Sequence, residues 1–101
     1  MEVLAREKGR LLTLMLAGEL DHHGAKEAMH QIEQEVDASV PLKLTLDFGK
    51  VSFMDSSGIA VVLRTQRKML ALGGSISVCN IPPQAKKVFD AAGINRLVTM
   101  I

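Results

Sequence analysis

The sequence predicts a single α/β domain built on a mixed β-sheet, and three patterns support this. Two short extended segments joined at Lys8-Gly9 predict an N-terminal hairpin. Segments with alternating apolar residues then alternate with segments whose apolar residues recur at helical spacing. Because parallel neighbours need a crossover, which a helix supplies, this order predicts parallel pairing beside the antiparallel hairpin.

Length and composition are typical of one compact domain. A chain of 101 residues buries roughly 60 to 65% of its unfolded surface around a single core, so we expect one domain over residues 1–101. No apolar run approaches the roughly 20 residues that a membrane span needs, and the N-terminus has no signal-peptide pattern. We therefore expect a cytoplasmic protein that does not bind membranes.

The charge balance and the aromatic content do not favour nucleic-acid binding. Twelve basic and eleven acidic residues give a formal charge of +1, and the only aromatic residues are three Phe. We expect no direct contact with nucleic acid. Cys79 is the only cysteine, so no internal disulfide or zinc cluster forms. We expect it to lie in a strand as a small buried side chain.

The first two strands are predicted at residues 3–7 and 10–17. In the second, one face carries Leu12, Leu14 and Leu16, and the other carries Leu11, Thr13, Met15 and Ala17. Both faces are mostly apolar, which indicates an interior strand.

A helix and a third strand follow the turn at residues 18–23. Apolar residues at helical spacing predict a helix over residues 24–38: Ala25, Ala28, Met29, Ile32 and Val36. Pro41 ends the connection, and residues 42–48 then alternate as a strand buried on one face.

The second half repeats this alternation. A helix begins after Asp55 and ends at Gly73-Gly74, with an apolar stripe of Ile59, Val62, Leu63, Met69 and Leu70. Residues 75–79 form a strand. A third helix enters through residues 80–83 and ends at Gly93, with Ala85, Val88, Phe89 and Ala92 on its apolar stripe. Residues 97–101 are expected to form a last strand.

The candidate site lies where the extended segment ending at Met54 turns into a helix, at Asp55-Ser56-Ser57-Gly58. Asp and Ser are preferred at helix N-termini because their oxygens accept from unpaired N–H groups. The same N–H groups and the helix dipole favour a bound anion. Capping alone explains these residues, as it does Asp21 at the start of the first helix. Alternatively, a hydroxyl of Ser56 or Ser57 accepts a phosphate.

Enzyme motifs are missing around these serines. No Gly-x-Ser-x-Gly elbow surrounds Ser56, and no phosphate-binding Gly-x-x-x-x-Gly-Lys-Ser/Thr loop occurs. The adjacent His22 and His23 cannot both face one metal ion, so we expect no metal site. We expect no intrinsic enzyme activity; the alternative is a small hydrolase or transferase that uses Ser56 as nucleophile with a histidine.

Two segments carry a resemblance to a known family. Gly18-Glu19-Leu20-Asp21-His22-His23 and Ser52-Phe53-Met54-Asp55-Ser56-Ser57-Gly58 resemble the two signatures of STAS-domain anti-sigma factor antagonists, and the similarity continues through Gly73-Gly74 and residues 87–93. The paired histidines resemble the sporulation member of the family; a stress-response regulator with a different kinase partner is the alternative. The resemblance implies a STAS-type mixed β-sheet with helices packed mainly on one side. The family usually continues into a further C-terminal helix, which we expect this chain to lack.

The resemblance also implies a function. The unphosphorylated protein would bind an anti-sigma factor that is itself a serine kinase with bound ADP or ATP, and so free a sigma factor. Phosphorylation would inactivate it, and a serine phosphatase would restore it. The kinase supplies nucleotide and metal, so we expect no cofactor and no catalytic residue in this chain.

The family pattern assigns the phosphate to Ser56, the serine immediately after the aspartate. It also implies that Asp21 lies near this serine on the face that meets the partner. We expect that face to comprise Asp21, Asp55, Ser56, Ser57, Gly58, Ile59 and Val61. Val61 falls off the main apolar stripe of its helix. We therefore expect its side chain at the surface, in contact with the partner.

Overall fold

The computed structural model describes residues 1–101 as one mixed five-stranded sheet with three helices. The elements are β1 (Glu2–Lys8), β2 (Leu11–Leu20), α1 (His22–Ser39), β3 (Lys43–Met54), α2 (Ser56–Ala71), β4 (Ser75–Cys79), α3 (Pro83–Ala92), the 3₁₀-helix η1 (Ile94–Arg96) and β5 (Thr99–Met100). The strand order is β1-β2-β3-β4-β5; β1 and β2 are antiparallel and the other pairs parallel. The predicted α/β class and mixed sheet are confirmed.

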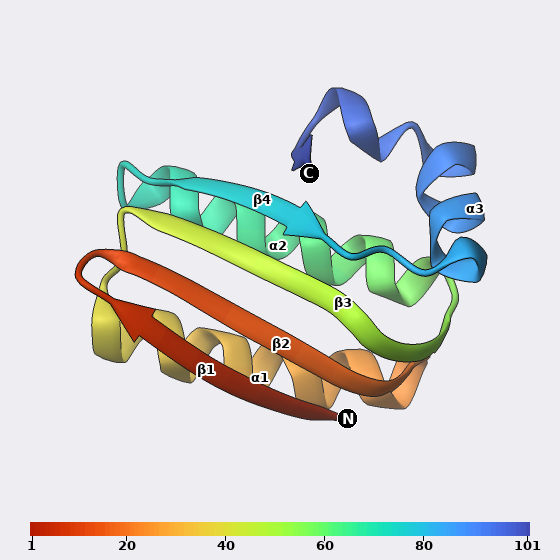
Figure 1. The fold of residues 1–101 in the computed structure, drawn as a ribbon, viewed down its shortest axis with the longest axis horizontal. Helices are drawn as coiled ribbons and strands as arrows, with labels where there is room; N and C mark the ends of the chain where they lie inside the picture. The colour runs from red at the N-terminus through yellow and green to blue at the C-terminus, as the bar shows by residue number, and fades with distance from the viewer.

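The core lies between the sheet and the two longer helices. Figure 1 shows α1 and α2 behind the sheet, whose other face carries no helix. Leu12, Leu14 and Leu16 of β2 point into this core and are buried. β2 lies between β1 and β3, as its two largely apolar faces predicted. In α1, the predicted stripe is also buried, with Gly24 in place of the half-buried Ala25.

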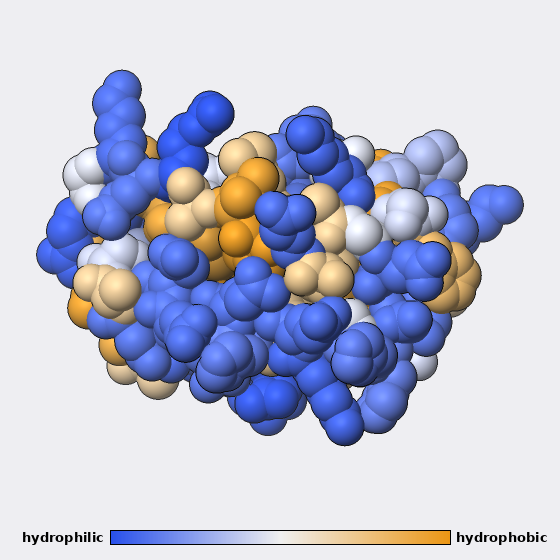
Figure 2. Space-filling view, turned by 90° about the horizontal axis from the view of Figure 1, so that it is seen from below, coloured by the Kyte–Doolittle hydropathy of each residue, from blue (hydrophilic) through white to orange (hydrophobic).

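One edge strand of the sheet is β1. Figure 2 shows this side of the molecule, where a cluster of apolar side chains is surrounded by a hydrophilic surface. Leu4 of β1 is exposed, but part of the backbone edge is covered by α1. The Val3 N–H donates to Gln31 Oε1 at 3.1 Å, and Gln31 Nε2 donates to the Met1 carbonyl oxygen at 3.3 Å. A covered edge is less available for pairing with another chain.

The buried stripe of α2 differs from the predicted one. Val61 is 1% exposed and Thr65 is fully buried, whereas Leu70 is 63% exposed. The sequence predicts Val61 at the surface because it falls off the stripe of Ile59, Val62, Leu63, Met69 and Leu70. In the structure the Thr65 hydroxyl donates to the Val61 carbonyl oxygen at 2.7 Å, so it enters the core with its hydrogen bond satisfied. The prediction that Val61 is a surface contact is therefore wrong.

β3 is longer than predicted and reaches Met54. Its alternation breaks at Gly49 and Lys50, which are both exposed, and its register with β2 shifts there. Such an irregularity is typical of a β-bulge, which adds a residue to one strand and bends it. A second shift follows between Gly18 and Glu19 of β2, after which β2 and β3 run together to their ends. β4 pairs with β3 only as far as Cys79 opposite Asp47.

Two further predictions hold in part. Cys79 lies in a strand, but its side chain is half-exposed rather than buried. Partial burial, with a smaller contribution from the Asp47 carboxylate, raises the pKa of its thiol. At the C-terminus the expected strand shrinks to the two residues of β5, because Leu97 and Val98 turn back after η1 and donate their N–H groups to the Ile94 carbonyl oxygen. None of the helices is both long and apolar enough to cross a membrane.

Candidate functional site

The two motifs meet at the carboxyl ends of β2 and β3. Leu20 and Met54 are paired at the ends of these parallel strands, and the Asp55 N–H donates to the Leu20 carbonyl oxygen at 3.4 Å. Asp21 and Asp55 follow directly, each one at the start of a helix. The fold therefore brings together two acidic residues that are far apart in sequence.

Both aspartates cap the helix that follows them. Asp21 Oδ1 accepts from the Gly24 N–H at 2.8 Å, and Asp55 Oδ1 accepts from the Ser57 N–H at 2.8 Å. These bonds satisfy N–H groups that have no partner within the helix, and a carboxylate is favoured at the positive end of the helix dipole. The predicted capping roles are confirmed. The caps fix the first turns of α1 and α2 at the carboxyl ends of β2 and β3.

The two serines differ in accessibility. Ser56 is the first residue of α2 and is exposed, whereas Ser57 is half-buried. Neither hydroxyl hydrogen-bonds to a histidine or to any other side chain. The Ser56 hydroxyl is thus open to a modifying enzyme, at a helix N-terminus that favours added negative charge.

The other predicted site residues are less exposed. Gly58 is buried, and Ile59 is half-buried against the core. Glycines bring both helix starts close to the sheet: a Cβ on Gly24 would lie 2.0 Å from the Glu19 carbonyl oxygen. Only Asp21, Asp55, Ser56, Ser57 and Ile59 of the predicted face therefore offer side-chain surface.

A groove between α1 and α2 opens beside Ser57. It encloses about 260 Å³ and is lined by His22, Ala25, Lys26, Met29, Ser57, Ala60, Val61 and Arg64. Its floor is mostly apolar, and Lys26 and Arg64 place cations at its sides. Arg64 Nη2 lies 3.3 Å from Glu33 Oε1. The sequence alone does not predict this groove, because it exists only once the two helices pack side by side.

Phe53 was also missed as a surface residue. It is 43% exposed and lies two residues before Asp55. Phe53 and the buried Met54 are neighbours in β3 and point to opposite faces of the sheet, so the exposure of Phe53 follows from the part of β3 that lies beyond the predicted strand.

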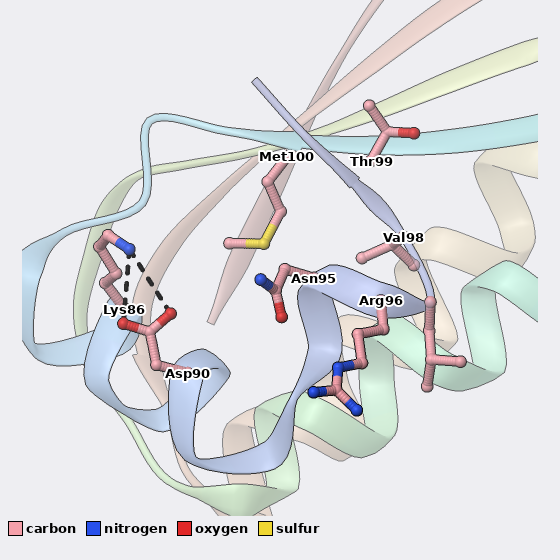
Figure 3. Close-up of a pocket in the computed structure, with 8 residues that line it drawn as sticks. Lys86, Asp90, Asn95, Arg96, Val98, Thr99 and Met100 are labelled. Carbon is pink, nitrogen blue, oxygen red and sulfur yellow. Dashed lines mark hydrogen bonds and ion pairs between the residues drawn. The ribbon is translucent and has the colours of Figure 1, made fainter.

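The largest cavity lies elsewhere, between α3, η1 and β5, and encloses about 590 Å³. In Figure 3 the paired side chains of Lys86 and Asp90 form one wall and Met100 faces them from the other side. The ion pair measures 3.4 Å. This cavity shares no residue with the two motifs. No group of three or more potential metal-binding side chains lies together in the molecule.

Comparison with known proteins connects the two motifs to one family. The family model described as STAS domain matches residues 2–101. The anti-sigma F factor antagonist of Lysinibacillus sphaericus is 31% identical over 94 residues, which cover 93% of this chain and 78% of that protein.

Solved structures of similar proteins include SpoIIAA in two states. The unphosphorylated form of the anti-sigma factor antagonist SpoIIAA is 27% identical, with a TM-score of 0.81 over 99% of this chain and 88% of that one. The phosphorylated form of the Bacillus cell fate determinant SpoIIAA has a TM-score of 0.73, again at 27% identity, over 99% of this chain and 91% of that one.

Proposed function

Because the chain belongs to the STAS domain family, we propose that it is an anti-sigma factor antagonist: it binds an anti-sigma factor and thereby frees a sigma factor. The similarity to an anti-sigma F factor antagonist and to SpoIIAA supports this function over most of the chain. Within the molecule, the observation that carries the proposal is the exposed Ser56 at the N-terminus of α2, beside the Asp21 motif.

Phosphorylation of Ser56 switches the protein off. The existence of SpoIIAA in unphosphorylated and phosphorylated forms supports such a switch. A phosphoserine adds about −1.5 to −2 charge at pH 7. The helix N-terminus accommodates that charge, so the fold persists and the effect falls on the partner. Asp21 and Asp55 add negative charge beside it, at the carboxyl ends of β2 and β3.

The partner is an anti-sigma factor that is itself a serine kinase with bound ADP or ATP, and a serine phosphatase reverses the reaction. Both assignments rest on the family resemblance of the two motifs. This chain then contributes the hydroxyl and the binding surface, while the kinase contributes nucleotide and metal. The location is the cytoplasm, where sigma factors act.

The contact surface combines apolar area with flanking charge. Ile59 and the exposed Phe53 lie on either side of the Asp55-Ser56 turn, and the groove between α1 and α2 begins at Ser57. Binding energy at interfaces concentrates in central apolar and aromatic contacts with a polar rim. Ile59, Phe53 and this groove, at whose floor Val61 is buried, therefore form the apolar part of the proposed partner face.

Sporulation is the biological setting that we favour over a stress response. The paired His22 and His23 resemble the sporulation member of the family, and the relative that is 31% identical is an anti-sigma F factor antagonist. The hydrolase alternative finds less support, because neither Ser56 nor Ser57 hydrogen-bonds to a histidine that could activate it.

The test asks whether anti-sigma kinases encoded beside this protein's gene bind the chain and phosphorylate it. The chain is incubated with kinase and ATP, and the phosphate is located by mass spectrometry. We expect stoichiometric phosphate on Ser56, none on Ser56→Ala, and wild-type labelling of the matched control Ser57→Ala. Anti-sigma binding by Ser56→Ala should persist. Phosphate on Ser57, or no complex with any of these kinases, would contradict the proposal.

A further inference from the structure

Gln84 of α3 hydrogen-bonds to both backbone groups of Met54. The Met54 N–H donates to Gln84 Oε1 at 2.8 Å, and Gln84 Nε2 donates to the Met54 carbonyl oxygen at 2.8 Å. We propose that Gln84 is a positioning residue that holds the end of β3 and with it the Asp55-Ser56 turn. The role in partner binding rests on the proposed function; the positioning itself does not.

These two backbone groups need a partner because β3 extends beyond β4. β4 last pairs with β3 where Cys79 lies opposite Asp47, while β2 accompanies β3 to Met54. In a strand the N–H and C=O of one residue point to the same side. The Asp55 N–H is directed at Leu20 of β2, so the backbone groups of Met54 face the side that β4 has left.

Burial makes these two hydrogen bonds consequential. The Met54 residue is fully buried, and a buried backbone group without a partner loses its hydrogen bonds to water. The side-chain amide of Gln84 supplies one donor and one acceptor, the same pair that a neighbouring strand would offer. Gln84 therefore extends the sheet by one residue at the site where the switch begins.

Gln84 is held by a helix with its own anchor in the core. Phe89 of α3 meets Phe48 of β3 edge to face, with ring centroids 5.4 Å apart, and Ala85 is buried beside Gln84. The backbone of α3 is thus fixed independently of the Met54 contact. Its position is transmitted through Gln84 to Met54, and from there to the Asp55 cap and the Ser56 hydroxyl.

The first test is hydrogen exchange measured by NMR on the full chain. Gln84→Met removes both hydrogen bonds at similar side-chain length, and Lys87→Met is the matched control at an exposed position of the same helix. We expect the Met54 amide to exchange about tenfold faster in Gln84→Met only, with no change at the core amide of Leu46. Gln84→Glu keeps the acceptor for the Met54 N–H, so protection at that amide should largely return.

The second test is the affinity for the anti-sigma factor, measured well below the melting temperature of each variant. A loosened turn must be ordered on binding, so we expect Kd to rise about tenfold for Gln84→Met and to stay unchanged for Lys87→Met. A global loss of stability alone would not speed up hydrogen exchange selectively at the Met54 amide, and it would not change the affinity at this temperature.

The two tests separate the possible failures. An unchanged exchange rate of the Met54 amide in Gln84→Met would overturn the positioning role, whatever the partner. Faster exchange at the Met54 amide with an unchanged Kd would overturn the importance of Gln84 for partner binding. If the wild-type chain binds no anti-sigma factor, the proposed function fails, and the exchange data alone still decide whether Gln84 positions the end of β3.

Discussion

Gly58 lies so close to Met54 that no side chain fits between them: an ideal Cβ on Gly58 would lie 2.4 Å from Met54 Cγ and 2.5 Å from Met54 Sδ. The first turn of α2 therefore rests directly on the last residue of β3. This contact, together with the Asp55 cap, fixes where the Ser56 hydroxyl emerges. The glycine of the motif is thus a packing requirement.

Gly58→Ala should destabilise the protein by about 1 to 3 kcal/mol, because overpacking forces Met54 or the helix to shift. The measurement is the free energy of unfolding in urea. In a Met54→Ala background the same substitution should cost clearly less, since the two closest atoms are gone and only Leu20 Cδ2, at 3.0 Å, stays near the added Cβ. Equal costs in both backgrounds would show that the Met54 contact is not the cause.

The Asp55 cap can be separated from the Asp55 charge. Asp55→Ala should cost about 0.5 to 2 kcal/mol of folding stability, because the Ser57 N–H loses its acceptor. Asp55→Asn keeps an oxygen at this position and should cost much less. Unfolding free energies of the two variants provide the comparison, and similar losses would mean that the charge, not the hydrogen bond, stabilises α2.

Val61 and its neighbour Ala60 test the corrected orientation of α2. Val61→Lys should destabilise the fold by about 3 kcal/mol or more, because Val61 is buried and a charge there lacks a partner. Ala60→Lys changes an exposed position that lines the groove, so stability should stay within about 0.5 kcal/mol while anti-sigma binding weakens. Melting curves and binding isotherms of both variants decide this. A stable Val61→Lys variant would place Val61 at the surface after all.

The sequence predicted most of the elements because their patterns are local. The apolar residues of α1 recur at helical spacing, and the predicted stripe through Ala28, Met29, Ile32 and Val36 is buried. β1 and β4 also occupy nearly the predicted ranges, whereas β2 continues to Leu20, three residues past its predicted end and into the predicted turn. The errors lie where a local rule is broken by a tertiary contact or a bulge.

Thr65 and the β3 bulge show two such cases. A buried threonine that bonds back to Val61 cannot be told from a surface threonine by type alone, so the face of α2 was misassigned. At Gly49 the alternation slips, which hid the continuation of β3 to Met54.

For the site, sequence predicted the caps at Asp21 and Asp55 but not the contacts made between elements. The groove beside Ser57 and the hydrogen bonds of Gln84 join residues from different elements. No spacing rule in a single sequence links position 84 to position 54. Only the packed structure places them together.

The last prediction concerns how a phosphate on Ser56 acts. Ser56 is exposed at a helix N-terminus, so phosphorylation should leave the backbone in place and weaken partner binding through repulsion and bulk. Ser56→Asp carries one carboxylate charge and less volume, and should therefore weaken the complex less than phosphorylation does. Raising the salt concentration should recover part of the lost affinity in both cases, because salt screens exposed charges.

Backbone amide NMR spectra of the free and phosphorylated forms, combined with binding isotherms at two salt concentrations, check this mechanism. Unphosphorylated Ser56→Ala is the control, since it carries no added charge and its affinity should depend least on salt. We expect shifts confined to the start of α2 and the neighbouring Asp21 turn. Gln84 ties Met54 to α3, so a movement of the end of β3 would be felt beyond the site. Shifts that spread over the whole sheet, with no salt dependence of the lost affinity, would therefore mean that the phosphate moves the end of β3. Repulsion would then not explain the loss of binding.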